Sequence, residues 1–191
     1  EKSNIDDFDA LNKKLSANVT SIDMRKASTL GVDINQFFKN PNTIVYAKEY
    51  YNRGNDNYAN VVVDGEAKSL ELTDANAFNA PEGFTATSVK LTRDVQKGVN
   101  SFVLPFVVTA TELGATQVAT YKDCTLGNVA NFTTVESVED NTPFLTMDVA
   151  EDKATAELNF GEKAIVATPE TLGTDFVGVY AKTDANGKYG I

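Results

Sequence analysis

The chain of 191 residues has no histidine, no tryptophan and a single cysteine, Cys124. Without histidine, neither a Ser-His-Asp nor a Cys-His arrangement can activate a nucleophile, and the usual zinc sites cannot form. Cys124 has no partner for an intramolecular disulfide, and we interpret it as a small apolar residue at a strand end. We therefore expect no catalytic residue, no metal site and no cofactor.

Long hydrophobic runs and positive charge are also scarce. No apolar stretch approaches the roughly 20 residues that span a bilayer as a helix, and the longest, 102–108, is interrupted by Pro105. Seventeen basic residues stand against 27 acidic ones, which gives a formal charge of −10. A surface of that sign repels phosphate backbones, so we expect no transmembrane segment and no nucleic acid partner.

Hydrophobic residues are nevertheless plentiful: they make up 42% of the chain, with 11 phenylalanines and seven tyrosines. That is enough to build a core, so we expect a folded chain and not one that is disordered throughout. The sequence opens on Glu1-Lys2-Ser3-Asn4, which does not resemble a signal peptide. Composition leaves two interpretations open, a cytosolic protein or an exported one whose leader has been removed.

The first part of the chain reads as a helix followed by short strands. Ile5, Phe8, Leu11 and Leu15 recur at helical spacing and predict a short N-terminal helix. Irregularly spaced β-type runs follow at 19–24, 43–47, 60–63 and 69–72, separated by loops rich in Asn, Asp and Gly. This pattern predicts a small solenoid of parallel strands, similar to leucine-rich-repeat coils, over residues 1–78. The alternative is an ordinary β-meander.

From residue 84 the strand-like runs are longer and alternate between apolar and polar residues. The runs at 84–93, 101–108, 117–123, 129–138, 143–149, 155–160, 163–168 and 175–182 predict an antiparallel β-sandwich over residues 79–191. The segment from Thr109 to Glu112 has the pattern of a capping box, and Gly114 predicts the end of a single helical turn. Gly178 is predicted to allow a neighbour to approach closely.

Four motifs in the second half occur in a familiar order. They are Ser101-Phe-Val-Leu-Pro-Phe106, Asn141-Thr-Pro-Phe-Leu145, Asp175-Phe-Val-Gly-Val-Tyr-Ala181 and Asp184-Ala-Asn-Gly-Lys188. Their order resembles a β-rich module of secreted and surface proteins of gut Bacteroidetes, some of which carry leucine-rich-repeat-like coils before the module. The chain departs from that pattern at Asn100-Ser101-Phe102, where relatives often have a tryptophan.

The resemblance covers about residue 19 to the end of the chain and implies export, to the outer cell surface or the extracellular space. It implies no enzymatic activity and no site residue, because members of the group are largely uncharacterised. Related proteins continue beyond the strand at which this chain ends, so the resemblance also implies a fragment truncated at its C-terminus.

A tyrosine-rich polar loop is the candidate binding site. Aromatic faces can stack on a ligand while charged side chains form hydrogen bonds, which suits a glycan or a protein. The alternative is a loop whose tyrosines merely pack at its base. The candidate ligand-binding residues are Tyr50, Tyr51, Arg53, Asp56 and Tyr58.

Two other chemistries are weaker alternatives. A carboxylate pair could serve a glycoside hydrolase, and Asp23, Asp64, Asp74, Asp123 and Asp148 lie near strand ends, but sequence cannot bring any two together. The segments 52–57 and 184–189 are rich in oxygen ligands for calcium, although turns prefer the same residues. We therefore expect a non-catalytic, adhesion-type interaction module whose partner is a glycan or a host or bacterial surface protein. The alternatives are a glycan-binding accessory module, a carboxylate-based hydrolase, and a structural spacer in a larger surface protein.

Overall fold

A computed structural model describes residues 18–26, 39–50, 57–74, 76–125, 129–173 and 175–180. The described residues are mainly β, as predicted, and they contain no helix of seven or more residues. Their one helical element is the 3₁₀ turn η2 (Thr111–Leu113). The helix predicted around residues 5–15 lies outside the described residues.

The largest sheet of the described part is mixed. Its order is β1 (Ser21–Asp23), β2 (Ile44–Ala47), β3 (Val61–Val63), β4 (Glu66–Ala67), β6 (Phe84–Ala86) and β15 (Lys163–Ile165). The first three strands are parallel, and β3 then turns back into antiparallel β4. The turn is Asp64-Gly65, whose φ angles of 51° and 80° are both positive, as in the tight turns that favour this dipeptide.

Three smaller sheets complete the described fold. One has the order β14 (Lys153–Phe160), β7 (Val89–Val95) and β5 (Leu70–Thr73). Another has the order β11 (Val129–Val135), β10 (Gln117–Thr125), β13 (Phe144–Val149) and β8 (Gly98–Phe102). The third pairs β12 (Ser137–Val138) with β9 (Val108–Thr109). Two of the four sheets combine strands from both sides of residue 78, and the division into two domains at that point stays a prediction.

The solenoid is not shown by the structure. The runs at 19–24, 43–47 and 60–63 do pair as successive parallel strands. The fourth run, however, joins another sheet, in which β5 pairs in parallel with β7. The reason is the Asp64-Gly65 turn, because it sends the chain back along β3 and ends the parallel series.

Three predicted runs are divided differently from the prediction, and a fourth forms no strand over its described residues. The run 129–138 is split between β11 and β12, which belong to different sheets. Residues 175–180, the described part of the run 175–182, are not in a strand. The run 84–93 is split between β6 and β7, which belong to different sheets. The run 101–108 stops at Phe102, and Pro105 stands in the gap before β9, since proline has no N–H to donate to a ladder. The capping interaction is confirmed in part: the Thr109 N–H donates to Glu112 Oε2 over 2.9 Å, and η2 ends at Gly114 with φ 65°. The Thr109 hydroxyl donates to the same carboxylate.

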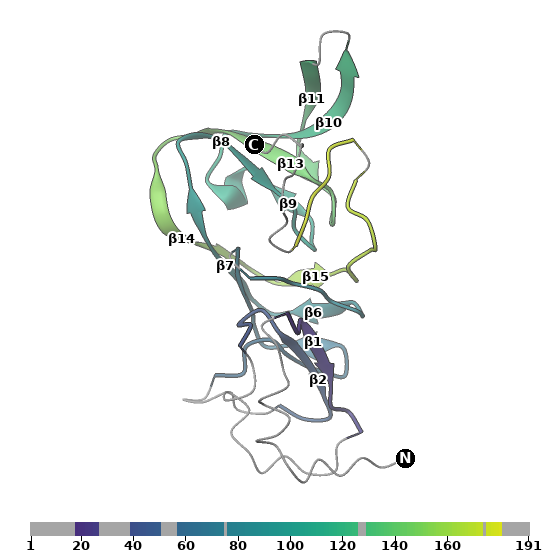
Figure 1. Cartoon of the computed structure of the whole chain (residues 1–191). Helices are drawn as coiled ribbons and strands as arrows, with labels where there is room; N and C mark the ends of the chain where they lie inside the picture. Colours follow the sequence, from purple (N-terminus) through teal and green to yellow (C-terminus); the bar gives the residue numbers. More distant parts are fainter. Residues whose placement is uncertain are drawn as a thin grey trace.

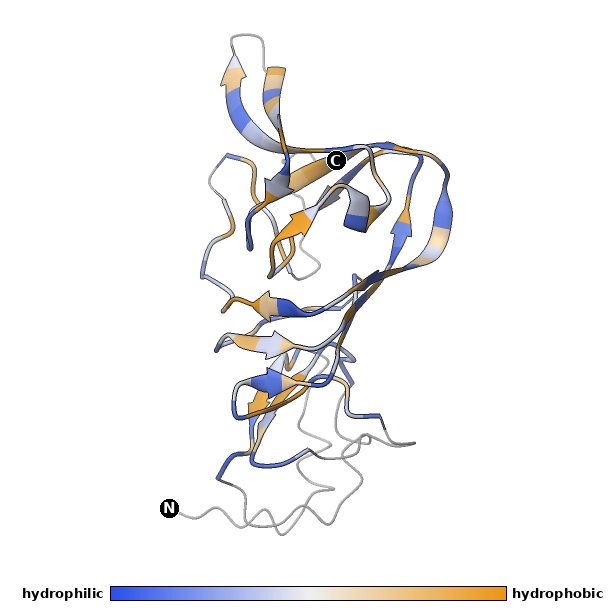
Figure 2. Ribbon diagram, turned by 180° about the vertical axis from the view of Figure 1, so that it is seen from behind, coloured by the Kyte–Doolittle hydropathy of each residue, from blue (hydrophilic) through white to orange (hydrophobic). Residues whose placement is uncertain are grey.

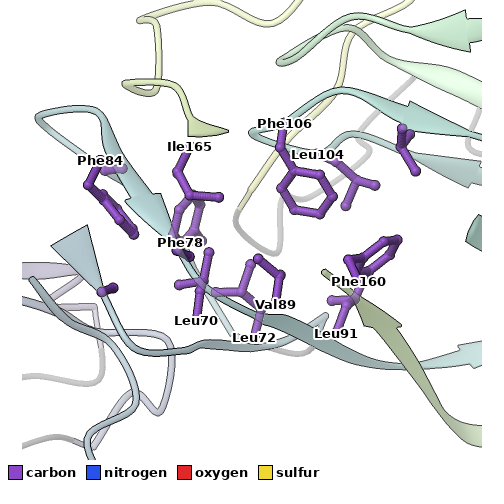
Figure 3. Close-up of a cluster of buried hydrophobic side chains, with 14 of the residues drawn as sticks. Leu70, Leu72, Phe78, Phe84, Val89, Leu91, Leu104, Phe106, Phe160 and Ile165 are labelled. Atoms are coloured by element: carbon purple, nitrogen blue, oxygen red, sulfur yellow. The ribbon is translucent and has the colours of Figure 1, made fainter. Parts of the chain in front are cut away.

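One hydrophobic cluster joins strands from all four sheets. Leu70 and Leu72 of β5 and Val89 and Leu91 of β7 point to the same side and meet Phe106 and Phe160 (Figure 3). Hydrophobic and hydrophilic residues alternate along several strands (Figure 2), as expected where one face of a sheet is buried. This alternation positions polar residues on the opposite face of β5 and β7.

Buried asparagines cover the outer edge of β5. Asn60, 1% exposed, donates from Nδ2 to the Glu71 carbonyl over 2.9 Å and accepts at Oδ1 from the Glu71 N–H over 2.7 Å. The same Nδ2 also donates to the Pro41 carbonyl. Because unpaired backbone groups at a sheet edge attract other strands, this carboxamide protects an edge with which no described strand pairs.

Strands β10 and β11 extend from the molecule as an arm (Figure 1). At the base of the arm Tyr121 and Phe132 contact each other, with ring centroids 5.8 Å apart, and Phe176 packs against both rings. The residues at the far end of β10, Lys122–Thr125, are exposed, including Cys124. Cys124 is therefore near a strand end as predicted, but it is exposed to solvent.

Candidate functional site

The structure brings together two of the five predicted binding residues. The rings of Tyr50 and Tyr58 lie at 86° to each other with centroids 6.3 Å apart. The Lys68 ammonium lies 4.7 Å from the Tyr50 centroid and 4.3 Å from the Tyr58 centroid. Both tyrosines are half-buried. We call these three residues the aromatic corner.

Local packing explains the position of Tyr50. Its ring lies against a small apolar cluster formed by Val45, Ala47 and Val61 of the parallel strands. Its hydroxyl donates to the Glu66 carbonyl over 3.1 Å. Burial, followed by the negative charges of Glu66 and Asp64, raises the pKa of the Tyr50 hydroxyl. Tyr50 is therefore a neutral, fixed ring that can act as one wall of a binding site.

Tyr51, Arg53 and Asp56, the other three predicted residues, lie outside the described residues. Lys68, which sequence reasoning missed, follows β4 and approaches the tyrosines from a different segment. Its cation–π contacts are the interaction expected between an ammonium and two aromatic faces. Within the described ranges no carboxylate forms an ion pair with Lys68, so its N–H donors remain available to a ligand's oxygen atoms.

A polar hollow of about 220 Å³ lies next to Tyr58 in the chain, since Asn57 and Ala59 both line it. Its floor comes from the polar faces of β5 and β7, where the Lys90 ammonium and the Glu71 carboxylate form an ion pair of 3.3 Å. We call it the β5–β7 hollow. Its lining residues are Pro41, Asn57, Ala59, Asn60, Glu71, Leu72, Thr73, Lys90 and Thr92.

Sequence reasoning missed the β5–β7 hollow because its lining comes from several separate segments. One signal could have indicated part of it: Lys90 and Thr92 alternate with apolar residues along β7, as Glu71 and Thr73 do along β5. Such alternation predicts a polar sheet face. It does not predict that another segment would enclose that face.

A second hollow, of about 230 Å³, tests the carboxylate alternative. Arg25, Asp64 and Glu82 line it, and the Arg25 guanidinium bonds both oxygens of Glu82, at 2.8 and 2.9 Å, and both oxygens of Asp23, at 2.7 and 2.9 Å. Hydrogen bonding to Arg25 lowers the pKa of Asp23 to about 2 and also lowers the pKa of Glu82. Both carboxyl groups are thus held ionised, whereas a glycosidase needs one that keeps its proton.

The other candidate carboxylates have separate partners. Asp74 Oδ2 lies 3.5 Å from Arg93 Nη2, Asp123 accepts a hydrogen bond from Asn131, and Asp148 accepts one from Thr116. In the described part of the chain, no group of three or more Cys, Asp or Glu residues converges as a metal site would require. The calcium-like segment 184–189 and most of 52–57 lie outside that part. No helix among the described residues is both long and apolar enough to cross a membrane.

Comparisons with known proteins identify no relative of this chain. No family model, no curated protein and no solved structure matches it.

Proposed function

We propose that this protein is a non-catalytic, adhesion-type interaction module that binds a glycan at the aromatic corner and the adjacent β5–β7 hollow. The observation that carries the proposal is the position of Tyr58. Its ring forms the aromatic corner, while its chain neighbours Asn57 and Ala59 line the hollow. An aromatic surface and a set of hydrogen-bonding groups therefore lie at the same loop.

The chemistry of the two features suits a ligand rich in hydroxyl groups. The C–H face of a sugar ring can stack on an aromatic side chain, and hydroxyls can exchange hydrogen bonds with carboxylates, amides and threonines. Lys68 lies over the two rings, so a stacking ligand must displace its ammonium. That ammonium has a flexible stem and can then donate to a ligand oxygen.

The absence of catalysis is part of the proposal. It is supported by the lack of histidine and by the ionised state of Asp23 and Glu82. We further propose a secreted or surface location, on the basis of the resemblance to exported Bacteroidetes proteins. The parallel series β1–β2–β3 supports a leucine-rich-repeat-like origin for the N-terminal sheet. The remaining strands support a β-sandwich-like second part.

The test is thermal unfolding of the protein in the presence of a panel of host and plant glycans. A ligand of the native state raises the transition temperature in proportion to RT ln(1 + [L]/Kd). A saturable rise with one glycan, weakened about tenfold in affinity by Tyr58→Ala, is the expected result for the loss of one stacking ring.

Tyr121→Ala is the matched control, because Tyr121 is also a half-buried tyrosine in an edge-to-face pair but belongs to the arm. If Tyr58→Ala and Tyr121→Ala leave the glycan affinity equal, the aromatic corner is not the site. If no glycan changes the transition temperature of the unmodified protein, the glycan proposal is wrong and the spacer role becomes the better account.

A further inference from the structure

Among the described residues, the outer edge of β11 is a strand edge that nothing covers. β11 is the last strand of its sheet and pairs with β10 alone among the described strands. In an antiparallel ladder alternate residues direct their N–H and C=O groups away from the neighbouring strand. In the described part of the chain, no hydrogen bond reaches the backbone of β11 from outside the β10 strand.

Two other edges in the same molecule are treated differently. The edge of β5 is covered by the Asn60 carboxamide, and Arg93 donates to the Ser101 carbonyl of β8. Natural sheets protect edges with such covers, with charged side chains, or with proline. β11 has the sequence Val-Ala-Asn-Phe-Thr-Thr-Val over Val129–Val135, with neither charge nor proline.

The arm that carries β11 is also poorly covered. Lys122–Thr125 on β10 and Val129, Ala130, Thr133 and Thr134 on β11 are all exposed. An isolated two-stranded ribbon is marginally stable in water, and additional strands stabilise it. The arm is therefore the part of this sheet whose stability increases most when a partner adds a strand.

We propose that β11 pairs antiparallel with β11 of a second copy of this chain, joining two four-stranded sheets across a two-fold axis. Such an interface is isologous, so each strand faces its own copy and any charge on it would lie close to a like charge. β11 carries no charge. With a net charge of −10, two copies repel each other over most of their surfaces. Contact through an uncharged strand adds the least to that repulsion.

The interface is small. A seven-residue strand is about 24 Å long, and an edge contact of that length falls below the roughly 1,200–2,000 Å² buried in stable complexes. The dimer therefore forms reversibly as the protein concentration rises. Added salt strengthens it, because salt screens the repulsion between the two acidic bodies.

The test is sedimentation equilibrium from micromolar to millimolar concentration, with paired charge variants. Thr133→Lys/Thr134→Lys and Thr133→Glu/Thr134→Glu are each expected to weaken dimerisation by about tenfold or more, because like charges meet across the axis. An equimolar mixture of the two variants is expected to recover it as a heterodimer. Thr85→Lys/Thr87→Lys, on exposed threonines within and directly after β6, a strand that is paired on both sides, adds the same charge and leaves the dimer unchanged.

Hydrogen exchange on the unmodified protein tests the proposal independently of whether the variants fold. The outward amides of β11 are expected to gain protection as concentration rises, while those of β6 stay constant. A protein that remains monomeric throughout, or a lysine variant that dimerises as well as its parent, overturns the proposal. If the protein remains monomeric, the edge of β11 stays available to pair with a strand of another protein. Neither result bears on the glycan site, which the arm does not share.

Discussion

The carboxamide of Asn42 pairs with the backbone of Thr73 in the way a neighbouring strand would. Asn42 Nδ2 donates to the Thr73 carbonyl over 2.8 Å, and the Thr73 N–H donates to Asn42 Oδ1 over 2.8 Å. Asn60 does the same at Glu71, two residues earlier on the same edge of β5. Two side chains from separate segments thus take the place of a neighbouring strand at an edge with which no described strand pairs.

The first prediction concerns Asn42, which is 1% exposed. Asn42→Ala leaves the N–H and C=O of Thr73 and the Asn76 carbonyl without this partner. We expect a loss of about 2–4 kcal/mol in the free energy of unfolding, since several buried polar groups lose their hydrogen bonds. Denaturant unfolding measures it. The exposed Asn159→Ala is the control and should stay within about 0.5 kcal/mol of the parent; equal losses in both variants would contradict the role of Asn42.

The second prediction separates two contributions of Asn60. Its φ angle is 62°, in the left-handed region. Asn60→Ala loses the hydrogen bonds and also forces an L side chain without a polar group into that region, at roughly 1–2 kcal/mol. Asn60→Gly loses only the hydrogen bonds, because glycine adopts positive φ freely. We expect the glycine variant to be the more stable of the two in denaturant unfolding, the reverse of the usual order. An alanine variant of equal or higher stability would show that backbone strain is not involved.

The third prediction concerns Gly173, with φ 84°. A Cβ atom there would lie in the space of the Phe176 carbonyl oxygen. Gly173→Ala is expected to cost more than about 2 kcal/mol of unfolding free energy, because strain at positive φ adds to the clash. Gly161→Ala is the matched control, since a Cβ atom at Gly161 meets nothing within 4 Å. A similar melting temperature in both variants would mean that the segment before Phe176 can rearrange at little cost.

The fourth prediction concerns stability in alkali. Tyr180 packs edge-to-face on Phe78 and donates its O–H to Asn141 Oδ1 over 3.0 Å. Burial, with a smaller effect of Asp140, raises the pKa of this hydroxyl above its ordinary value of 10.0. A raised pKa means that the contribution to stability is complete below about pH 10 and is lost as the pH rises above it, because the unfolded tyrosine ionises first.

Unfolding of Tyr180→Phe across this pH range tests that statement. The variant is expected to be less stable than the parent by about 1 kcal/mol at neutral pH, from the lost hydrogen bond. Above about pH 10 the difference should shrink, since phenylalanine cannot ionise. Parallel stability curves for the two proteins would show that Tyr180 does not contribute to the alkaline transition.

The fifth prediction concerns the pKa of Asp23, about 2 in the folded protein because of its hydrogen bonds to Arg25. Arg25→Gln should return this pKa toward the usual value of about 3.9, measured by carbon NMR of the carboxyl group. Because the pKa of Asp23 is lower in the folded protein, its ionised carboxylate stabilises the fold at pH values above the ordinary pKa. This contribution to stability is lost as the pH falls from about 4 to 2. Lys122→Gln, on the exposed arm, is the control and should leave the Asp23 pKa unchanged. An unchanged value in Arg25→Gln would refute the assigned cause.

Some features could be predicted because they depend on neighbouring residues. The alternation in β14 and the glycine after η2 are local patterns, and both predictions were confirmed. Gly178 does allow close approach: a Cβ atom there would lie 2.9 Å from Val103 and 3.0 Å from Pro143. The Asp64-Gly65 turn carried an equally local signal, and its significance for the order of the strands was missed.

The sequence by itself determined the β-rich class, the exclusion of histidine chemistry and the positions of most strands, since these follow from composition and from short-range periodicity. Only the tertiary structure decided which sheet each strand joins, that Lys68 meets Tyr50 and Tyr58, and that Asn42 and Asn60 pair with the edge of β5 as a strand would. The physical reason is distance along the chain. Asn42 and Thr73 are 31 residues apart, and no local propensity specifies a hydrogen bond between groups that meet only once the core has formed.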